Sequence, residues 1–101
     1  MAAITATRTG NHYRLEIEGH AGTHDACVMI SALLYALVGT IANNESVTVH
    51  YETLEEGHAV VDYLSDDCTG EEDMKCILIG MLQVQQTYPD AGIEIKQNIF
   101  V

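Results

Sequence analysis

The sequence predicts an α+β domain of two layers, in which two helices cover a mostly antiparallel sheet in the order ββαββαβ. Three observations support this fold class. Several segments alternate apolar and polar residues, as strands with one buried face do. Two longer segments carry apolar residues at helical spacing. Turn residues separate neighbouring strands closely enough for hairpins, which pair antiparallel. The chain has 101 residues, so we expect residues 1–101 to form one domain.

A hairpin opens the chain. Residues 4–8 form a short strand, and residues 9–12, Thr-Gly-Asn-His, are typical of a turn. Residues 13–18 alternate apolar with charged side chains, which predicts a second strand with one face in the core. This strand ends at residues 19–22, which contain two glycines.

The first helix is expected to begin with Asp25 as its N-cap, which places Cys27 in the first turn. It runs to about Ala42 and ends at two asparagines. Apolar residues occupy nearly every side of this helix. Because a sheet covers only one side of a helix, we expect the second apolar face to contact another copy of the chain in a homodimer.

The second half repeats the strand and helix pattern. Residues 47–52 alternate and predict a third strand, residues 54–57 turn the chain, and residues 58–64 pair back as a fourth strand. A capping box with Thr69 as N-cap and Glu72 at the third helical position predicts the start of the second helix.

An apolar stripe over residues 74–84 continues the second helix, which ends before Pro89. Residues 93–96 alternate and form the last strand. The tetrapeptide Glu-Gly-His-Ala occurs at residues 18–21 and again at 56–59. The sequences that follow the two copies do not match, so we interpret the tetrapeptide as a coincidence rather than an internal repeat.

The charge balance limits the class of partner. Lys and Arg number 4 against 15 Asp and Glu, which gives a formal net charge of −11. A chain this acidic offers no cationic surface to nucleic acid or to an anionic membrane, but it attracts basic proteins. The sequence has no glycine-rich phosphate-binding motif, so we expect no nucleotide and no other cofactor.

The sequence also predicts a cytoplasmic protein. The first residues do not have the charged and then apolar pattern of a secretory signal, and the longest apolar stretch is too short for a membrane span. The cysteines Cys27, Cys68 and Cys76 are odd in number and form no Cys-x-x-Cys pair. Free thiols are therefore expected rather than disulfides.

The candidate chemistry is concentrated between His20 and Cys27. A helix start stabilises a thiolate, and an imidazolium folded over it does so further. His20 and Cys27 could thus form an activated nucleophile with a general base and acid. The backbone amides of Cys27 and Val28 are candidate oxyanion donors. Ser31 lies one turn beyond Cys27 on the same helix face and is a supporting candidate.

Two other interpretations stay open for the same residues. His20, His24 and Cys27 have ligand types suited to zinc. Alternatively, Cys27 is a half-buried thiol at a helix start beside two surface histidines, with no catalytic role. Of the remaining groups, Cys68 is a weaker nucleophile candidate and Cys76 a core residue. The histidines elsewhere are expected to be surface groups or to stabilise strand pairing: His12, His50 and His58.

The residues around this site resemble the ribosomal-processing cysteine protease (Prp) family. The family pattern is Gly-His-Ala, a loop, Asp, and then Cys-x-x-x-Ser opening an apolar helix. Here His20 stands in Gly-His-Ala, Asp25 in the loop, and Cys27 and Ser31 open the helix. The order of elements is similar over the whole chain. The loop before Cys27 is shorter than in the family, and Asp25 precedes Cys27 by two residues instead of three. With these two differences the chain resembles a divergent member of the family.

This resemblance implies a cytoplasmic cysteine endopeptidase, a hydrolase that removes the N-terminal extension of a large-subunit ribosomal protein during ribosome biogenesis. Cys27 would be the nucleophile, His20 its base and acid, and Asp25 the acidic loop residue. The family is homodimeric and its ribosomal substrate is basic. The alternatives are a non-catalytic dimeric binding module and a small zinc-binding domain that uses His20, His24 and Cys27.

Overall fold

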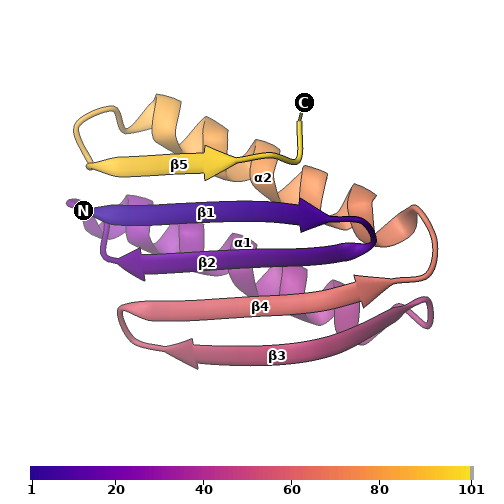
Figure 1. Ribbon diagram of the computed structural model, residues 1–101. Coiled ribbons are helices and arrows are strands. Elements are labelled where there is room, and N and C mark those ends of the chain that lie inside the picture. Colours follow the sequence, from indigo (N-terminus) through magenta and orange to yellow (C-terminus); the bar gives the residue numbers. More distant parts are fainter. Residues whose placement is uncertain (101) are drawn as a thin grey trace.

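The computed structural model describes residues 1–100, and its elements follow the predicted order ββαββαβ (Figure 1). The α+β fold class is therefore confirmed. The first half consists of two strands and a helix: β1 (Ala2–Thr9), β2 (His12–Gly19) and α1 (His24–Ala42). The second half consists of three strands and a helix: β3 (Val47–Glu55), β4 (His58–Ser65), α2 (Thr69–Thr87) and β5 (Ile93–Gln97).

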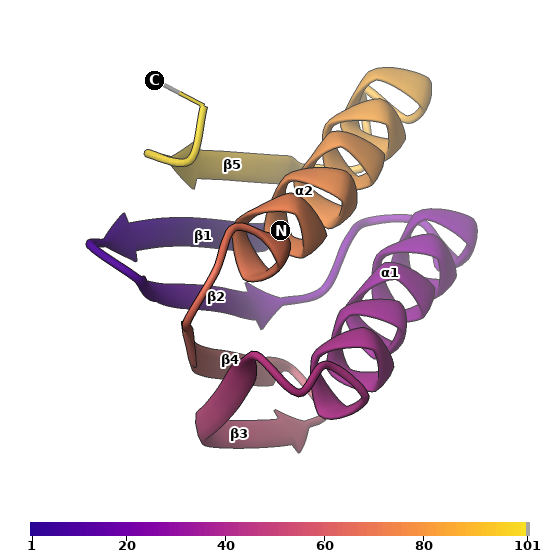
Figure 2. The ribbon, with the colours of Figure 1, turned by 90° about the vertical axis from the view of Figure 1, so that its right-hand side faces the viewer.

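The five strands form one sheet in the order β3-β4-β2-β1-β5. The neighbouring pairs β1–β2, β2–β4 and β3–β4 are antiparallel, whereas β5 runs parallel to β1 at the edge. The parallel pair arises because α2 crosses over the sheet between β4 and β5. Both helices lie side by side on one face of the sheet and leave the other face without a helix (Figure 2).

The core lies between the helices and the sheet. Strand residues of period 2 point into it: Ala2, Ile4 and Ala6 from β1, and Tyr13, Leu15 and Ile17 from β2 are all buried. The helices contribute a buried stripe each: Ala26, Ile30, Leu34, Leu37 and Ile41 from α1, and Met74, Ile77, Leu78, Met81 and Val84 from α2. Burying this apolar surface supplies the main stabilisation of the fold.

The start of α1 differs from the prediction. Thr23 is the N-cap, with extended backbone angles, and its side-chain oxygen accepts a hydrogen bond from the Ala26 amide at 3.3 Å. The prediction that Asp25 caps the helix is therefore wrong. Asp25 instead lies in the first turn, where its negative charge is favourable to the helix dipole.

The start of α2 also differs. The helix begins at Thr69, but Cys68 occupies the N-cap position and makes no side-chain cap hydrogen bond. The Thr69 amide donates to Asp67 Oδ1 at 2.9 Å, and hydrogen bonds from Thr69 lower the pKa of Asp67. The predicted capping box of Thr69 and Glu72 is thus wrong, because Asp67 satisfies the first amide instead.

Replacement of Thr23 by alanine is expected to destabilise the fold by about 1 kcal/mol, because the Ala26 amide loses its acceptor. For a domain of this size the midpoint of thermal unfolding falls by roughly 4–8 °C. The matched control is Asp25→Ala, which removes no cap and should have the smaller effect. An Asp25→Ala loss larger than that of Thr23→Ala in thermal denaturation would contradict the assignment of the cap.

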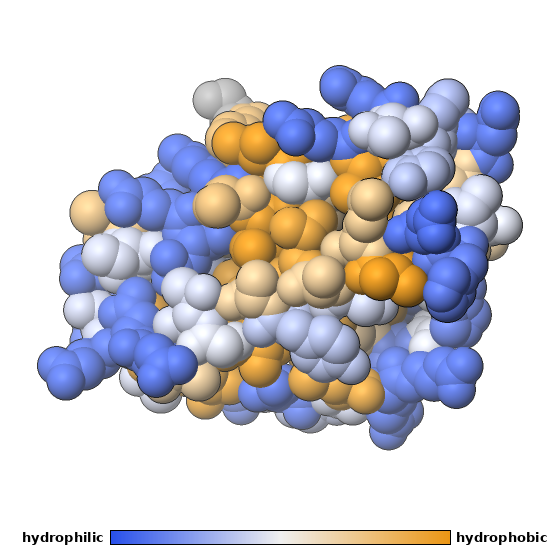
Figure 3. All heavy atoms as spheres, turned by 180° about the vertical axis from the view of Figure 1, so that it is seen from behind, coloured by the Kyte–Doolittle hydropathy of each residue, from blue (hydrophilic) through white to orange (hydrophobic). Residues whose placement is uncertain are grey.

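The outer face of the helices is apolar (Figure 3). Val28, Met29 and Tyr35 of α1 are 51%, 43% and 60% exposed, and Ile79 of α2 is 46% exposed. The helix α1 is long and apolar enough to cross a membrane, but core helices of soluble proteins often have the same length and composition. In this structure its inner stripe packs on the sheet, and its outer side is a large exposed apolar surface.

Candidate active site

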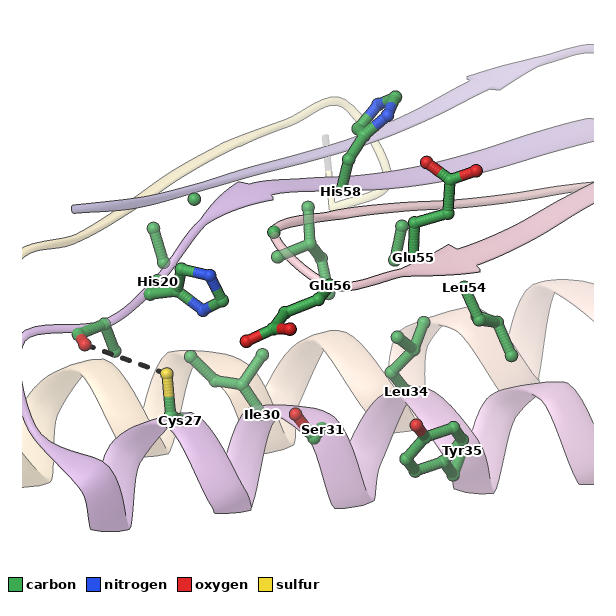
Figure 4. A pocket seen from close by; sticks show the side chains of 16 residues that line it. His20, Cys27, Ile30, Ser31, Leu34, Tyr35, Leu54, Glu55, Glu56 and His58 are labelled. Atoms are coloured by element: carbon green, nitrogen blue, oxygen red, sulfur yellow. Dashed lines mark hydrogen bonds between the residues drawn. The ribbon is translucent and has the colours of Figure 1, made fainter.

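A cavity of about 370 Å³ opens at one end of the sheet. Its walls are the end of β2, the first turns of α1 and the turn between β3 and β4. Figure 4 shows the side chains that line it. His20, Cys27 and Ser31, three of the residues selected from the sequence, all line this one cavity.

The local backbone explains how His20 and Cys27 come to share the cavity. His20 directly follows β2, where Gly19 turns the chain with a φ of 81°. The loop after it is held by the Gly22 amide, which donates to the Ala91 carbonyl at 2.6 Å. The chain then enters α1, so that Cys27 faces back toward His20. In Figure 4 the His20 ring lies above the Cys27 sulfur.

The thiol and the imidazole are not hydrogen-bonded to each other in the free chain. Cys27 is half-buried, and its Sγ donates to the Ala21 carbonyl at 3.7 Å. His20 is exposed, and within residues 1–100 neither of its ring nitrogens has a hydrogen-bond partner. No hydrogen bond among residues 1–100 therefore holds the imidazole away from the sulfur.

The duplicated tetrapeptide builds this end of the sheet. In the register of β2 and β4, Glu18 pairs with His58, so the two copies lie side by side and antiparallel. The Gly19 amide donates to the Gly57 carbonyl at 2.8 Å. A Cβ on Gly57 would lie 3.3 Å from His20 Nε2, and its φ of 79° is strained for any other residue. The second copy thus provides the surface on which His20 rests.

Glu56 is a site residue that sequence analysis did not identify. It lies in the turn between β3 and β4 and lines the cavity. Figure 4 shows its carboxylate pointing into the cavity beside His20 and above Ser31. A Glu-Glu-Gly turn looks like an ordinary solvated hairpin in the sequence. The one available signal was that Glu56 opens the second copy of the tetrapeptide.

The supporting candidates differ in position. The Ser31 side chain faces the cavity, and its hydroxyl makes no hydrogen bond to the Cys27 carbonyl in the described chain. Asp25 is exposed and is not part of the cavity wall, and neither is His24. The carboxylate that lies beside His20 in Figure 4 is therefore that of Glu56 and not that of Asp25.

The predicted oxyanion donors are not free. The Cys27 amide donates to the Thr23 carbonyl at 3.1 Å. Val28 lies one residue further into the helix, where each amide bonds to the carbonyl four residues earlier. The prediction depended on Asp25 as N-cap. Because the helix begins two residues earlier, its unpaired first-turn amides belong to His24 and Asp25.

The predicted zinc ligands do not converge. Among residues 1–100, the metal-binding side chains that gather with donor atoms within 4.8 Å of one another do not include the set of His20, His24 and Cys27. The geometry of this cavity therefore gives no support to the zinc interpretation of these three residues.

His58, at the rim of the cavity, is already paired. Its Nε2 lies 2.8 Å from Glu16 Oε2. This hydrogen bond is the main cause that raises the pKa of His58 and lowers that of Glu16. In Figure 4 the His58 ring points away from Cys27. His20 is thus the one histidine of the described chain that stands free beside the thiol.

The fold is that of the ribosomal processing proteases. It matches the ribosomal processing protease Prp from S. aureus in complex with a covalently linked product peptide, with a TM-score of 0.81 and 16% identity over 97% of this chain and 100% of that chain. The same protease with a substrate peptide matches with a TM-score of 0.74 and 19% identity, again over 97% and 100%.

A Streptococcus mutans protein is also similar, with a TM-score of 0.68 and 18% identity over 97% of this chain and 96% of its own. No family model matches the sequence, and no curated protein matches it either. Because the sequence identities are below 20%, these structural matches establish the Prp fold for this chain and no more than the fold.

Proposed function

We propose that this protein is a cysteine endopeptidase in which Cys27 is the nucleophile and His20 the general base and acid. One observation carries the proposal: His20 and Cys27 line a single cavity on a fold shared with a protease of known structure. Because a half-buried thiol beside a free imidazole is the arrangement of an activated nucleophile, the cavity suits covalent catalysis.

The reaction requires four steps. His20 turns toward Cys27 and takes the thiol proton that Ala21 accepts in the free chain. The thiolate attacks the peptide carbonyl, and the tetrahedral adduct collapses to a thioester as His20 protonates the leaving amine. His20 then removes a proton from a water molecule, which attacks the thioester. The acid product leaves and the Cys27 thiol is restored.

Glu56 and Ser31 are proposed to assist His20. The Glu56 carboxylate points into the cavity beside His20, so it favours the imidazolium that forms when the thiol is deprotonated. The Ser31 hydroxyl is free to bind the peptide backbone. Asp25, the acidic residue that the family resemblance implies, contributes through the helix start rather than by lining the cavity.

The proposed substrate is the N-terminal extension of a basic protein, and the resemblance to the Prp family points to a large-subunit ribosomal protein. The net charge of −11 and the Glu55 and Glu56 carboxylates at the cavity favour a cationic partner. The S. aureus protease with a substrate peptide supports a peptide substrate. Three free cysteines suit a reducing, cytoplasmic compartment.

Incubation with an N-terminally extended large-subunit ribosomal protein tests this function. Mass spectrometry should find one new N terminus that grows with time and requires the wild-type protein. A substrate that stays intact under conditions in which the S. aureus protease processes its own substrate would contradict the proposal.

The apolar outer face of α1 and α2 is proposed to form a homodimer. Its exposed side chains include Val28, Met29 and Tyr35, and burial of such a surface favours association. Sedimentation velocity over a concentration series is expected to show a dimer, and Tyr35→Glu, which places a charge on this face, is expected to shift the species to monomer. A wild-type protein that is monomeric at every concentration would contradict the proposed contact.

A non-catalytic dimeric binding module is the second candidate. The observation that favours it is the hydrogen bond of the Cys27 thiol to the Ala21 carbonyl instead of to His20. In such a module Cys27 would react with an alkylating agent no faster than the exposed Cys68.

A further inference from the structure

We propose that the sheet face without helices holds a binding site for a divalent cation such as Zn²⁺, formed by His12, His50 and Asp62. These residues come from β2, β3 and β4, which are neighbours in the sheet. The site begins at the opposite end of β2 from His20, and on the face opposite to α1. It is therefore independent of the proposed protease function.

The three donor atoms already lie close together. His12 Nε2 contacts Asp62 Oδ1, and His50 Nδ1 lies 3.8 Å from the same oxygen. One ligand atom from each of the three residues lies within 4.8 Å of the others. Ligand atoms about 2.0–2.1 Å from a tetrahedral zinc are roughly 3.3 Å apart, so small side-chain movements complete the geometry.

His50 lies at a β-bulge of β3, opposite Asp62. The pairing of β3 with β4 changes register between Val49 and Tyr51, so His50 is the extra residue on the bulged strand. The His50 ring meets the His12 ring edge-on, with centroids 5.9 Å apart. Val49, just before His50, pairs with Tyr63 of the core, so alternation along β3 places His50 on the face without helices, next to Asp62.

Asp62 has the features of a held metal ligand. Its side chain is only 8% exposed, although it lies on a face without a helix. Arg14 Nη1 lies 3.3 Å from Oδ2, which fixes the carboxylate and leaves Oδ1 directed at both histidines. Such outer contacts orient metal ligands. The Arg14 side chain is 43% exposed, so solvent screens its charge from a cation at Oδ1.

The donor set points to zinc. Two imidazoles and one carboxylate are ligands that Zn²⁺ prefers, and a fourth position stays open to water. The exposed His50 side chain, at 66%, leaves room for that water. A bound ion would join the edge strand β3 to β4 and β2, because its ligands come from all three strands.

The second cluster on this face provides a matched control. Glu16, Glu18 and His58 also bring three ligand atoms together. However, His58 is paired with Glu16, and none of the three residues is buried. His58→Gln therefore removes another exposed histidine from the same sheet face without altering the proposed site.

Zinc titration by calorimetry tests the proposal, with Co²⁺ absorption spectra to identify the ligand type. Wild-type protein and His58→Gln are expected to bind one Zn²⁺ per chain. Binding to His50→Gln is expected to weaken at least 10-fold, and Co²⁺ is expected to give no thiolate charge-transfer band. Zinc at roughly 100 times its dissociation constant should raise the unfolding midpoint of the wild type by roughly 11–22 °C.

Three results would overturn the site. They are the absence of saturable zinc binding, an affinity in His50→Gln equal to that of the wild type, and a thiolate band that assigns the metal to a cysteine. Circular dichroism should show that His50→Gln keeps the wild-type fold, because the His50 side chain is exposed. A loss of zinc affinity in this variant then reports on the ligand and not on unfolding. His12→Gln is a second variant, which should also weaken binding at least 10-fold.

Discussion

Replacement of Cys27 by alanine is expected to abolish peptide cleavage and leave the fold intact. Removal of a covalent nucleophile from a catalytic unit lowers turnover by at least about 10⁴-fold, because no other group can form the acyl intermediate. The side chain is small and half-buried, and its one hydrogen bond is a weak contact to the Ala21 carbonyl. Cleavage followed by mass spectrometry and thermal unfolding followed by circular dichroism separate the two effects.

Cys76→Ala is the matched control for this variant. The prediction that Cys76 is a core residue is wrong, because Cys76 is an exposed cysteine on α2, and it does not line the cavity. We expect the Cys76→Ala variant to cleave at the wild-type rate. Cleavage by Cys27→Ala at a similar rate to Cys76→Ala would exclude Cys27 as the nucleophile.

Replacement of His20 by glutamine is expected to lower the cleavage rate by about 10³-fold, within the range that a general acid and base contributes. Glutamine fills a similar volume against Gly57 but cannot accept and return the thiol proton. The loss should appear mainly in kcat, since His20 acts on the reacting atoms rather than on remote parts of the peptide.

His24→Gln is the control for His20→Gln. His24 is four residues further along, exposed and outside the cavity wall, so its replacement should leave kcat within about 2-fold of the wild type. Equal losses in the two variants would contradict a specific role for His20. A loss confined to His24→Gln would show that His24 rather than His20 acts as the base.

The sequence predicted the strands and helices well because each was encoded locally. Alternation in β2 and the apolar stripe of α2 are short-range patterns, and the core residues that they imply are buried. The caps were less predictable. Thr23 and Asp25 are both good N-cap residues two positions apart, so local sequence does not choose between them, and the Gly22 amide just before the helix is held by a long-range hydrogen bond to the Ala91 carbonyl. The helix start in turn decided which amides are free.

The candidate site was predictable only in part. His20 and Cys27 are seven positions apart and joined by one loop, so local reasoning placed both at the cavity. Glu56 comes from a distant hairpin, and its approach to His20 depends on the pairing of β2 with β4. The cluster of His12, His50 and Asp62 draws on three strands and their register. No local pattern in the sequence encodes that arrangement.

Alkylation of the three cysteines as a function of pH tests the pairing of His20 and Cys27 most directly, since it needs no substrate. An ordinary thiol, with a pKa near 8.5, is less than about 1% ionised at pH 6. We expect Cys27, although half-buried, to react with iodoacetamide at pH 6 faster than the exposed Cys68 and Cys76, and His20→Gln to remove this advantage. Cys27 labelling that rises only near pH 8.5, no faster than Cys68 and unchanged in His20→Gln, would contradict an activated thiol.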